Sequence, residues 1–355
     1  MRQSRILPVI FLGLVFAAMG TGLSHAASPA SEAAAAPNAN GNSKVTLDVV
    51  VAAKSGAPVS GLQAADFTLL DNNSPQTLSS FQAAGGMVAK ADPPVELILV
   101  LDALNTGVIT VDKARQSLPS LFREDGGVLP LPTSLIVLSD RGFTIQDHPT
   151  RDGRALMDFL TKNTTGLREH RGNGWEIDTE RRDLSLRALR AIVAEESKRP
   201  GRKLVVWIGR GWASLGTELG GMSDKWRHDE FIHVVELSDA LRQAHMTLYS
   251  VDPQGVGIRE HWEDSVYKGV SSEREVNYAS LVLEVLARQT GGLELEGSND
   301  IAQMVHRCIA DANAYYVLTF NPPAAAHANE YHGIEVKVNK PGLTARTRAG
   351  YYAQP

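Results

Sequence analysis

An apolar run from Val95 to Leu101, interrupted only by Glu96 and followed directly by Asp102, constrains the fold more than any other stretch. A run of this kind suits a strand that is covered on both faces, as in a parallel sheet flanked by helices. Ligands of such sheets bind just beyond the carboxyl ends of the strands. Asp102 is therefore the first candidate for a functional residue.

The middle of the chain alternates between strand-like and helix-like stretches. Further strand-like runs are Ser134 to Leu138, Lys203 to Ile208 and Met246 to Val251. The helix-like stretches are Val111 to Arg123, Arg151 to Thr161, Arg181 to Ser197, Asp229 to Ala244, Tyr278 to Thr290 and Asp300 to Ala312. This alternation predicts right-handed crossovers and an α/β fold with a doubly wound, mainly parallel sheet over residues 92–312.

Both flanks of this region have the period of two that is typical of strands. Residues 44–83 contain three or four short alternating runs, and residues 313–355 contain three more. Because a unit of three or four strands is marginal alone, we expect the two flanks to pair with each other. The expected product is a smaller β-sandwich-like domain made from both chain ends.

The first 26 residues have the layout of a secretory signal peptide. Arg2 and Arg5 precede an apolar run of about 13 residues, which is shorter than the ~20 residues that span a bilayer, so cleavage is favoured over a retained anchor. Residues 27–43 contain mostly Ala, Ser, Pro, Asn and Gly, which predicts a flexible linker. We expect a mature chain in the periplasm or the extracellular space, without a membrane span.

Composition and motifs exclude several function classes. The formal net charge of −5 offers no electrostatic case for nucleic-acid binding. The sequence contains no Gly-x-Ser-x-Gly nucleophile elbow, no phosphate-binding glycine loop and no His-Glu-x-x-His zinc motif. Cys308 is the single cysteine, so an intramolecular disulfide is impossible. We therefore expect a non-enzymatic protein, with a hydrolase that uses an unrecognised site as an alternative.

Short motifs give the chain a resemblance to a known family. They are Leu-x3-Asp-Phe-x-Leu-x-Asp-x4-Gln-x-Leu-x2-Phe over Leu62 to Phe81, the turn Pro200 to Lys203, the run Tyr315 to Leu318, and Arg-Ala-Gly-Tyr-Tyr over Arg348 to Tyr352. With the order of elements, they make the chain resemble the von Willebrand factor type A domain and a related family of exported proteins described mainly from acidobacteria. The resemblance implies a Rossmann-like α/β domain that binds another protein.

The resemblance also implies a metal-ion-dependent adhesion site. In the type A domain, a first loop Asp-x-Ser-x-Ser, a Thr from a second loop and an Asp from a third hold Mg²⁺. Here Asp102 and Thr106 match, but Leu104 replaces the first Ser and Arg210 stands at the third-loop Asp. The remaining candidate ligands are Asp102, Asn105 and Thr106. We expect a degenerate site, and we hypothesise that Arg210 pairs with Asp102 in place of the ion.

The function expected from these features is protein binding of the adhesion or scaffold type, with no cofactor and an unidentified protein as partner. The binding surface would be the carboxyl edge of the sheet. Its candidate contact residues are Asp140, Arg141, Arg210, Trp212 and Asp252. The main alternative keeps a divalent cation, with Mg²⁺ bound through Asp102 and Thr106 for adhesion of the usual kind.

Overall fold

The computed structural model describes residues 44–85, 94–163, 174–212, 222–254 and 264–355. The expected signal peptide and linker, residues 1–43, lie outside these ranges. Within them, no helix is both long enough and apolar enough to cross a membrane.

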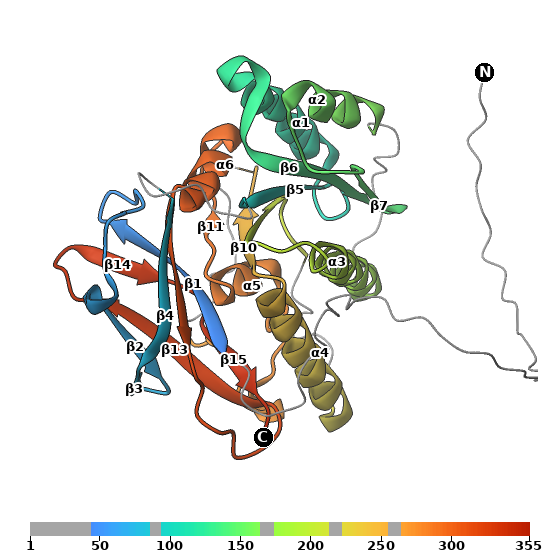
Figure 1. Ribbon diagram of the computed structural model, residues 1–355. Coiled ribbons are helices and arrows are strands. Elements are labelled where there is room, and N and C mark those ends of the chain that lie inside the picture. Colours follow the sequence, from blue (N-terminus) through green and yellow to red (C-terminus); the bar gives the residue numbers. More distant parts are fainter. Residues whose placement is uncertain (1–43, 86–93, 164–173, 213–221, 255–263) are drawn as a thin grey trace, which may run out of the picture. The chain divides into compact units, whose positions relative to one another are not determined.

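A seven-stranded, mainly parallel sheet forms the centre of the described chain (Figure 1). Its strands are, in order, β11 (Glu294–Leu295), β10 (Met246–Val251), β9 (Lys203–Ile208), β5 (Glu96–Asp102), β6 (Val128–Ser139) and β7 (Gly142–Ile145), with β8 (Thr150–Asp152) also paired to β6. The first five run parallel, while β7 and β8 are antiparallel to β6. The expected α/β fold with a mainly parallel sheet is therefore present.

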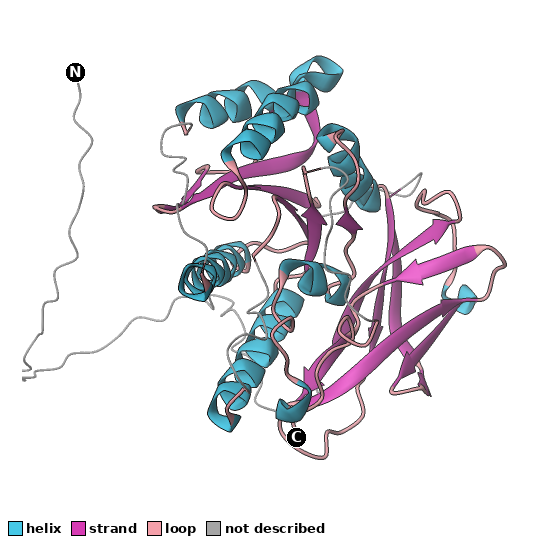
Figure 2. Cartoon of the chain, turned by 180° about the vertical axis from the view of Figure 1, so that it is seen from behind, coloured by secondary structure: helices cyan, strands magenta, loops and turns pink. Residues whose placement is uncertain are grey.

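Helices cover both faces of this sheet (Figure 2). One apolar cluster joins Leu97, Leu99 and Leu101 of β5 to α1 (Val108–Arg123), α2 (Gly153–Lys162) and α6 (Ile301–Ile309). The alternate residues Ile98 and Val100 join the other cluster, with α3 (Trp175–Glu196), α4 (Asp224–Gln243) and α5 (Leu283–Gln289). Successive side chains of a strand point to opposite faces, so a strand buried on both sides must be apolar throughout.

Two four-stranded antiparallel sheets are built from the flanks of the chain. One has the order β14 (Leu343–Arg346), β1 (Val45–Ala53), β12 (Ala314–Phe320), β4 (Leu78–Gly85), and the other has the order β15 (Gly350–Ala353), β13 (Glu330–Val338), β2 (Phe67–Asp71), β3 (Ser74–Gln76). Strands from the amino-terminal flank thus pair with strands from the carboxyl-terminal flank. The residues between the two sheets form a third apolar cluster.

Short 3₁₀ turns complete the described elements. They are η1 (Ala64–Asp66), η2 (Glu124–Gly127), η4 (Glu273–Glu275) and η5 (Ala310–Ala312). Buried polar contacts near η5 connect the antiparallel and central sheets: Asp311 accepts hydrogen bonds from Tyr249 of β10 at 2.6 Å and from Arg346 of β14 at 2.5 Å. Burial and the adjacent Asp311 carboxylate raise the pKa of Tyr249, so its phenol remains a donor at neutral pH.

Candidate functional site

The predicted site residues lie at the carboxyl edge of the central sheet. Asp102 ends β5, and Gly209 and Arg210 follow β9. Backbone hydrogen bonds connect neighbouring loops at this edge: Ala103 donates to Leu138 at 2.8 Å, and Gly209 donates to Val251 at 2.9 Å. The ends of β5, β6, β9 and β10 therefore form one continuous rim.

The Asp102 carboxylate is fully buried and accepts four hydrogen bonds. Its Oδ1 accepts from the backbone N–H of Leu104 at 3.0 Å and of Asn105 at 2.9 Å. Its Oδ2 accepts from Asn105 Nδ2 at 2.8 Å and Trp207 Nε1 at 2.9 Å. Burial raises the pKa of Asp102, and the four hydrogen bonds oppose that shift. Because every partner is an N–H donor, the surroundings match the ionised carboxylate.

The register of the sheet explains why Trp207 reaches Asp102. Trp207 is paired with Val100 across β9 and β5, and Val100 and Asp102 share one face of β5. A buried indole needs an acceptor for its N–H, and Asp102 is the next residue on that face. Trp207 is fully buried and packs edge-on against Trp212, with ring centroids 5.2 Å apart.

A second connection runs from the first loop to α3. Asn105 Nδ2 donates to Ser185 Oγ at 2.9 Å, in addition to its contact with Asp102. Ser185 in turn donates to the backbone oxygen of Arg181 at 2.8 Å. Asp102, Asn105, Trp207 and Ser185 form one hydrogen-bonded set, in which only Asn105 is partly exposed, and which we call the Asp102 network. Reasoning from the sequence missed Trp207 and Ser185, although a tryptophan in an otherwise aliphatic buried strand was a signal for Trp207.

The loop after β9, which begins with Gly209 and Arg210, lies directly on the loop after β5, from Asp102 to Thr106. A Cβ atom on Gly209 would lie 2.6 Å from Asp102 Cβ and 2.8 Å from Thr106 Oγ1. The next residue is held by its backbone, since the N–H of Arg210 donates to Thr106 Oγ1 at 3.0 Å. Glycine is therefore required at position 209 for the close approach of the two loops.

Gly209→Ala is expected to lower the free energy of unfolding by about 1–3 kcal/mol, because the added methyl group must push the buried Asp102 or Thr106 aside. Urea denaturation measures this change. The control is Gly107→Ala, at the start of α1, where an added Cβ meets no atom within 4 Å. Equal stability of the two variants would contradict the close packing of the loops.

These residues do not fit a Mg²⁺ site. The ion requires oxygen ligands, but both oxygens of Asp102 already face N–H donors, and Asn105 directs its Nδ2 toward Asp102. Leu104 is 5% exposed and packs in the core. The sequence offers Thr179 as a candidate for the second-loop Thr of the type A domain, and this residue lies in the second turn of α3. No group of three or more His, Cys, Asp or Glu in the described ranges could hold a metal ion.

The hypothesised ion pair between Arg210 and Asp102 is wrong. Arg210 is exposed, whereas Asp102 is fully buried and takes its hydrogen bonds from Leu104, Asn105 and Trp207. The physical reason is that an indole N–H from the neighbouring strand reaches the carboxylate without bringing a second full charge into the core.

The candidate contact residues divide into exposed and buried ones. Arg141 and Arg210 are exposed, and Asp140, which precedes Arg141 in the turn after β6, is partly buried. Trp212 is only 2% exposed, and its Nε1 donates to the backbone oxygen of Leu281 at 2.7 Å. Asp252 is also 2% exposed, and its Oδ1 accepts from the N–H of Gln254 at 2.9 Å. The prediction of Trp212 and Asp252 as surface contacts is therefore corrected.

Trp207→Phe is expected to lower the free energy of unfolding by about 2 kcal/mol, because the variant removes an N–H donor to a buried carboxylate and retains most of the apolar area. Near-ultraviolet circular dichroism should change as well, since Trp207 contacts Trp212 edge-on. The matched control is Trp226→Phe, because Trp226 lies on α4 and is only partly buried. A loss no larger than that of the control would contradict the assigned hydrogen bond.

Comparisons with known proteins identify no family. No family model matches the chain, and no curated protein matches it by sequence. Thirty-six chains of solved structures match, among them the human COPII-coat protein Sec24c, at 9% identity and a TM-score of 0.34. That match covers 74% of this chain and 44% of Sec24c, so the chain spans less than half the length of Sec24c. A likeness at this level carries no argument about fold or function.

Proposed function

We propose that the chain is an exported, non-enzymatic protein-binding protein whose von Willebrand A-like domain binds its partner without a divalent cation. The observation that supports this proposal most is the saturation of Asp102 by four N–H donors in a fully buried position. A metal could reach this carboxylate only after several of these hydrogen bonds had broken. Export is inferred from the layout of the first 26 residues.

The Asp102 network holds the loops of the carboxyl edge in place, as a bound metal ion would otherwise do. It joins the first loop to β9 through Trp207 and to α3 through Ser185. Fully satisfied buried polar networks rigidify the elements that they connect. A rigid edge loses less conformational entropy on binding, so it favours association with a protein partner.

The exposed side chains of this edge favour an acidic partner surface. Arg141 and Arg210 are both exposed, on the loops that follow β6 and β9, the two strands on either side of β5. Guanidinium groups bind carboxylates with two parallel hydrogen bonds. In a metal-dependent site the ion receives a carboxylate of the partner, and here the two arginines would receive it directly.

The test begins with cross-linking and capture of the partner from the native envelope fraction, followed by affinity measurements with the purified partner. Arg210→Asp is expected to weaken binding at least about tenfold, or ~1.4 kcal/mol. The matched control is Arg154→Asp. Arg154 is exposed at the start of α2, directly after β8, and β8 pairs with the beginning of β6. Arg154 therefore lies away from the carboxyl edge. The control should bind like the wild type, and a chelator should leave all affinities unchanged.

Two outcomes would contradict this proposal. Loss of binding in the chelator would favour cation-dependent adhesion through Asp102 and Thr106. Turnover in a broad hydrolase screen of the purified chain, abolished by a single substitution, would favour an enzyme.

A further inference from the structure

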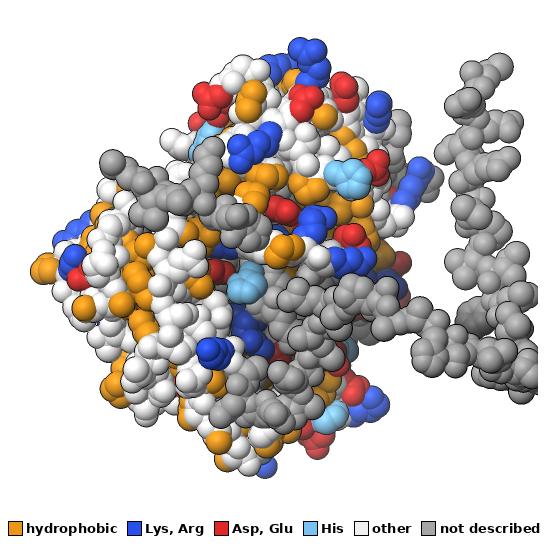
Figure 3. Space-filling model, viewed as in Figure 1, with side chains coloured by type: hydrophobic (Ala, Val, Ile, Leu, Met, Phe, Trp, Pro, Cys, Tyr) orange, Lys and Arg blue, Asp and Glu red, His pale blue; other side chains and the backbone are white. Residues whose placement is uncertain are grey.

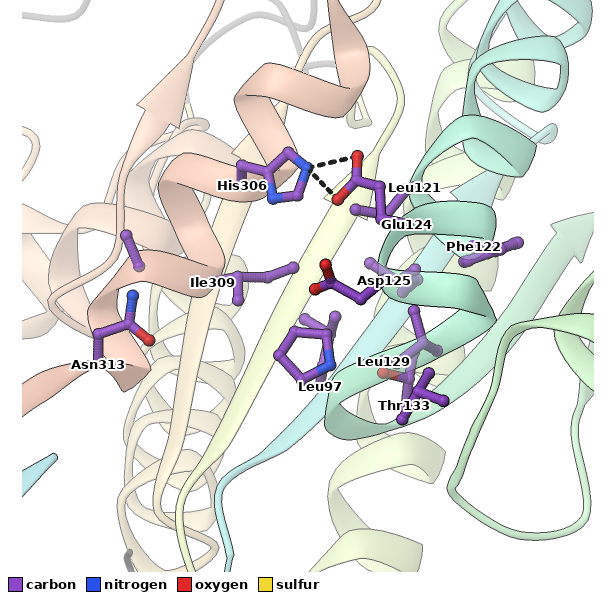
Figure 4. Close-up of a pocket in the computed structure, with 14 residues that line it drawn as sticks. Leu97, Leu121, Phe122, Glu124, Asp125, Leu129, Thr133, His306, Ile309 and Asn313 are labelled. Carbon is purple, nitrogen blue, oxygen red and sulfur yellow. Dashed lines mark hydrogen bonds and ion pairs between the residues drawn. The ribbon is translucent and has the colours of Figure 1, made fainter. Parts of the chain in front are cut away.

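A cavity of about 220 Å³ lies at the opposite side of the central sheet, near the amino ends of β5 and β6 (Figure 4). Leu97 comes from the start of β5, and Val128 and Leu129 come from the start of β6. The carboxyl-terminal ends of α1 and α6 close two sides, through Phe122 and Ile309. The cavity is separate from the carboxyl edge described above.

The inner wall of the cavity is apolar. It consists of buried core side chains, namely Leu97, Leu99, Leu121, Phe122, Leu129 and Ile309. Val128, at the rim, is 62% exposed and is one of three exposed large hydrophobic residues in the described chain. Such a wall stabilises the hydrocarbon part of a ligand by removing it from water.

The rim of the cavity carries two adjacent carboxylates. Glu124 accepts from His306 Nε2, at 2.9–3.0 Å. Asp125 makes no hydrogen bond or ion pair through its side chain with any described residue, and Figure 4 shows its carboxylate extending toward Ile309 over the apolar wall. The space-filling view shows acidic and histidine side chains close together over the ends of α1 and α6 (Figure 3).

The backbone holds Asp125 in this position. Asp125, Gly126 and Gly127 have positive φ angles of 46°, 72° and 85°. Three successive residues with positive φ form a sharp turn at the end of α1. Aspartate tolerates this left-handed conformation better than most residues do. The carboxylate therefore stands at the mouth of the cavity because of the turn.

The electrostatics of the cavity favour a cation. Two helices, α1 and α6, end at its wall, and the carboxyl-terminal end of a helix carries a partial negative charge. Asp125 adds a full negative charge that no described side chain pairs. The exposed Arg123 and Arg307 lie on the same helices but do not line the cavity, and His306 is already paired with Glu124.

We propose that this cavity binds a small amphiphilic amine, with its apolar body against Leu97, Leu129 and Ile309 and its ammonium group at Asp125. A cavity of about 150 Å³ lined by apolar side chains accommodates benzene. A volume of about 220 Å³ therefore suits a single ring with a short aminoalkyl chain. The proposal is independent of the protein-binding function of the other edge.

Calorimetric titration with three probes of the same size tests this proposal: 2-phenylethylamine, 2-phenylethanol and phenylacetate. Because Asp125 is exposed, the amine is expected to bind about three- to fivefold more tightly than the alcohol, which corresponds to roughly 0.6–1 kcal/mol, and the acid is expected not to bind. Asp125→Asn should reduce the affinity for the amine to that for the alcohol, and asparagine also tolerates the left-handed turn.

The matched control is Asp112→Asn, which removes the same charge from an exposed position near the start of α1. Asp112 is about 17 Å from the carboxyl-terminal end of α1 along the helix, at 1.5 Å per residue. The Asp112→Asn variant should leave the affinities for all three probes unchanged. Equal affinities for the amine and the alcohol, or an equal effect of the two variants, would overturn the proposal. Absence of amine binding to the wild-type chain would overturn it as well.

Discussion

Asp102→Asn is expected to lower the free energy of unfolding by about 3–4 kcal/mol, although it changes the side-chain volume very little. The carboxamide has one acceptor oxygen, so its NH₂ group must face either the pair Leu104 and Asn105 or the pair Asn105 and Trp207. In both orientations two N–H donors lose their acceptor, one buried and one, from Asn105, partly buried, and each loss costs about 1–3 kcal/mol.

Urea denaturation of Asp102→Asn and of Asp112→Asn measures this effect. Asp112 is exposed on α1, so its variant should stay within about 0.5 kcal/mol of the wild type. The near-ultraviolet signal of Trp207 should change only in Asp102→Asn. If Asp102→Asn were as stable as its control, the four assigned hydrogen bonds could not all be present.

Glu230→Gln is expected to have an effect of similar or larger size, about 3–5 kcal/mol, because it removes the buried counter-charge of the Arg182 guanidinium and leaves only the exposed Asp183, 4.0 Å away. Glu230 of α4 forms an ion pair with Arg182 of α3, and the two residues are only 3% and 5% exposed. Arg182 lies three residues before Ser185, whose hydroxyl accepts from Asn105. Loss of the pair should therefore also disturb the Asp102 network.

The same helix offers the control Glu236→Gln, since Glu236 is exposed and should be replaceable at a cost within about 0.5 kcal/mol. A double variant, Arg182→Met with Glu230→Leu, should recover most of the lost stability, because apolar residues of similar volume often replace a buried pair without loss. Failure of the double variant together with a stable Glu230→Gln would contradict the assignment of the pair.

The parallel strands were predictable because their signal is local. Predicted strands over Lys203 to Ile208 and Met246 to Val251 agree with β9 and β10. The strand predicted over Ser134 to Leu138 is longer in the structure, where β6 begins at Val128. The prediction stopped short because Pro130 and Pro132 argue against a strand. Residues 142–145 form the short antiparallel strand β7, which the alternation of strands and helices did not predict.

Helix boundaries were less predictable, because capping side chains and turns set them. The helix expected from Asp229 begins at Asp224 in the structure, because the Ser223 side chain accepts from the N–H of Trp226 and caps it. The helix expected over Tyr278 to Thr290 is confined to Leu283–Gln289. Both differences depend on single hydrogen bonds or turns that hydrophobic periodicity does not specify.

The chemistry of the site could be predicted only in part. The sequence placed Asp102 at a strand end and showed that Leu104 and Arg210 disagree with a metal site. It could not show that Trp207 donates to Asp102, because that contact depends on the register between β5 and β9. The burial of Trp212 depends on a contact with Leu281, 69 residues away in the chain.

Calorimetric titration of Mg²⁺ and Mn²⁺ into the purified chain distinguishes an Asp102 that is satisfied by Trp207 and Asn105 from one that binds a cation. If the N–H donors satisfy Asp102, neither ion gives saturable heat or raises the melting temperature. Micromolar binding of Mn²⁺ that Asp102→Ala abolishes would contradict this assignment.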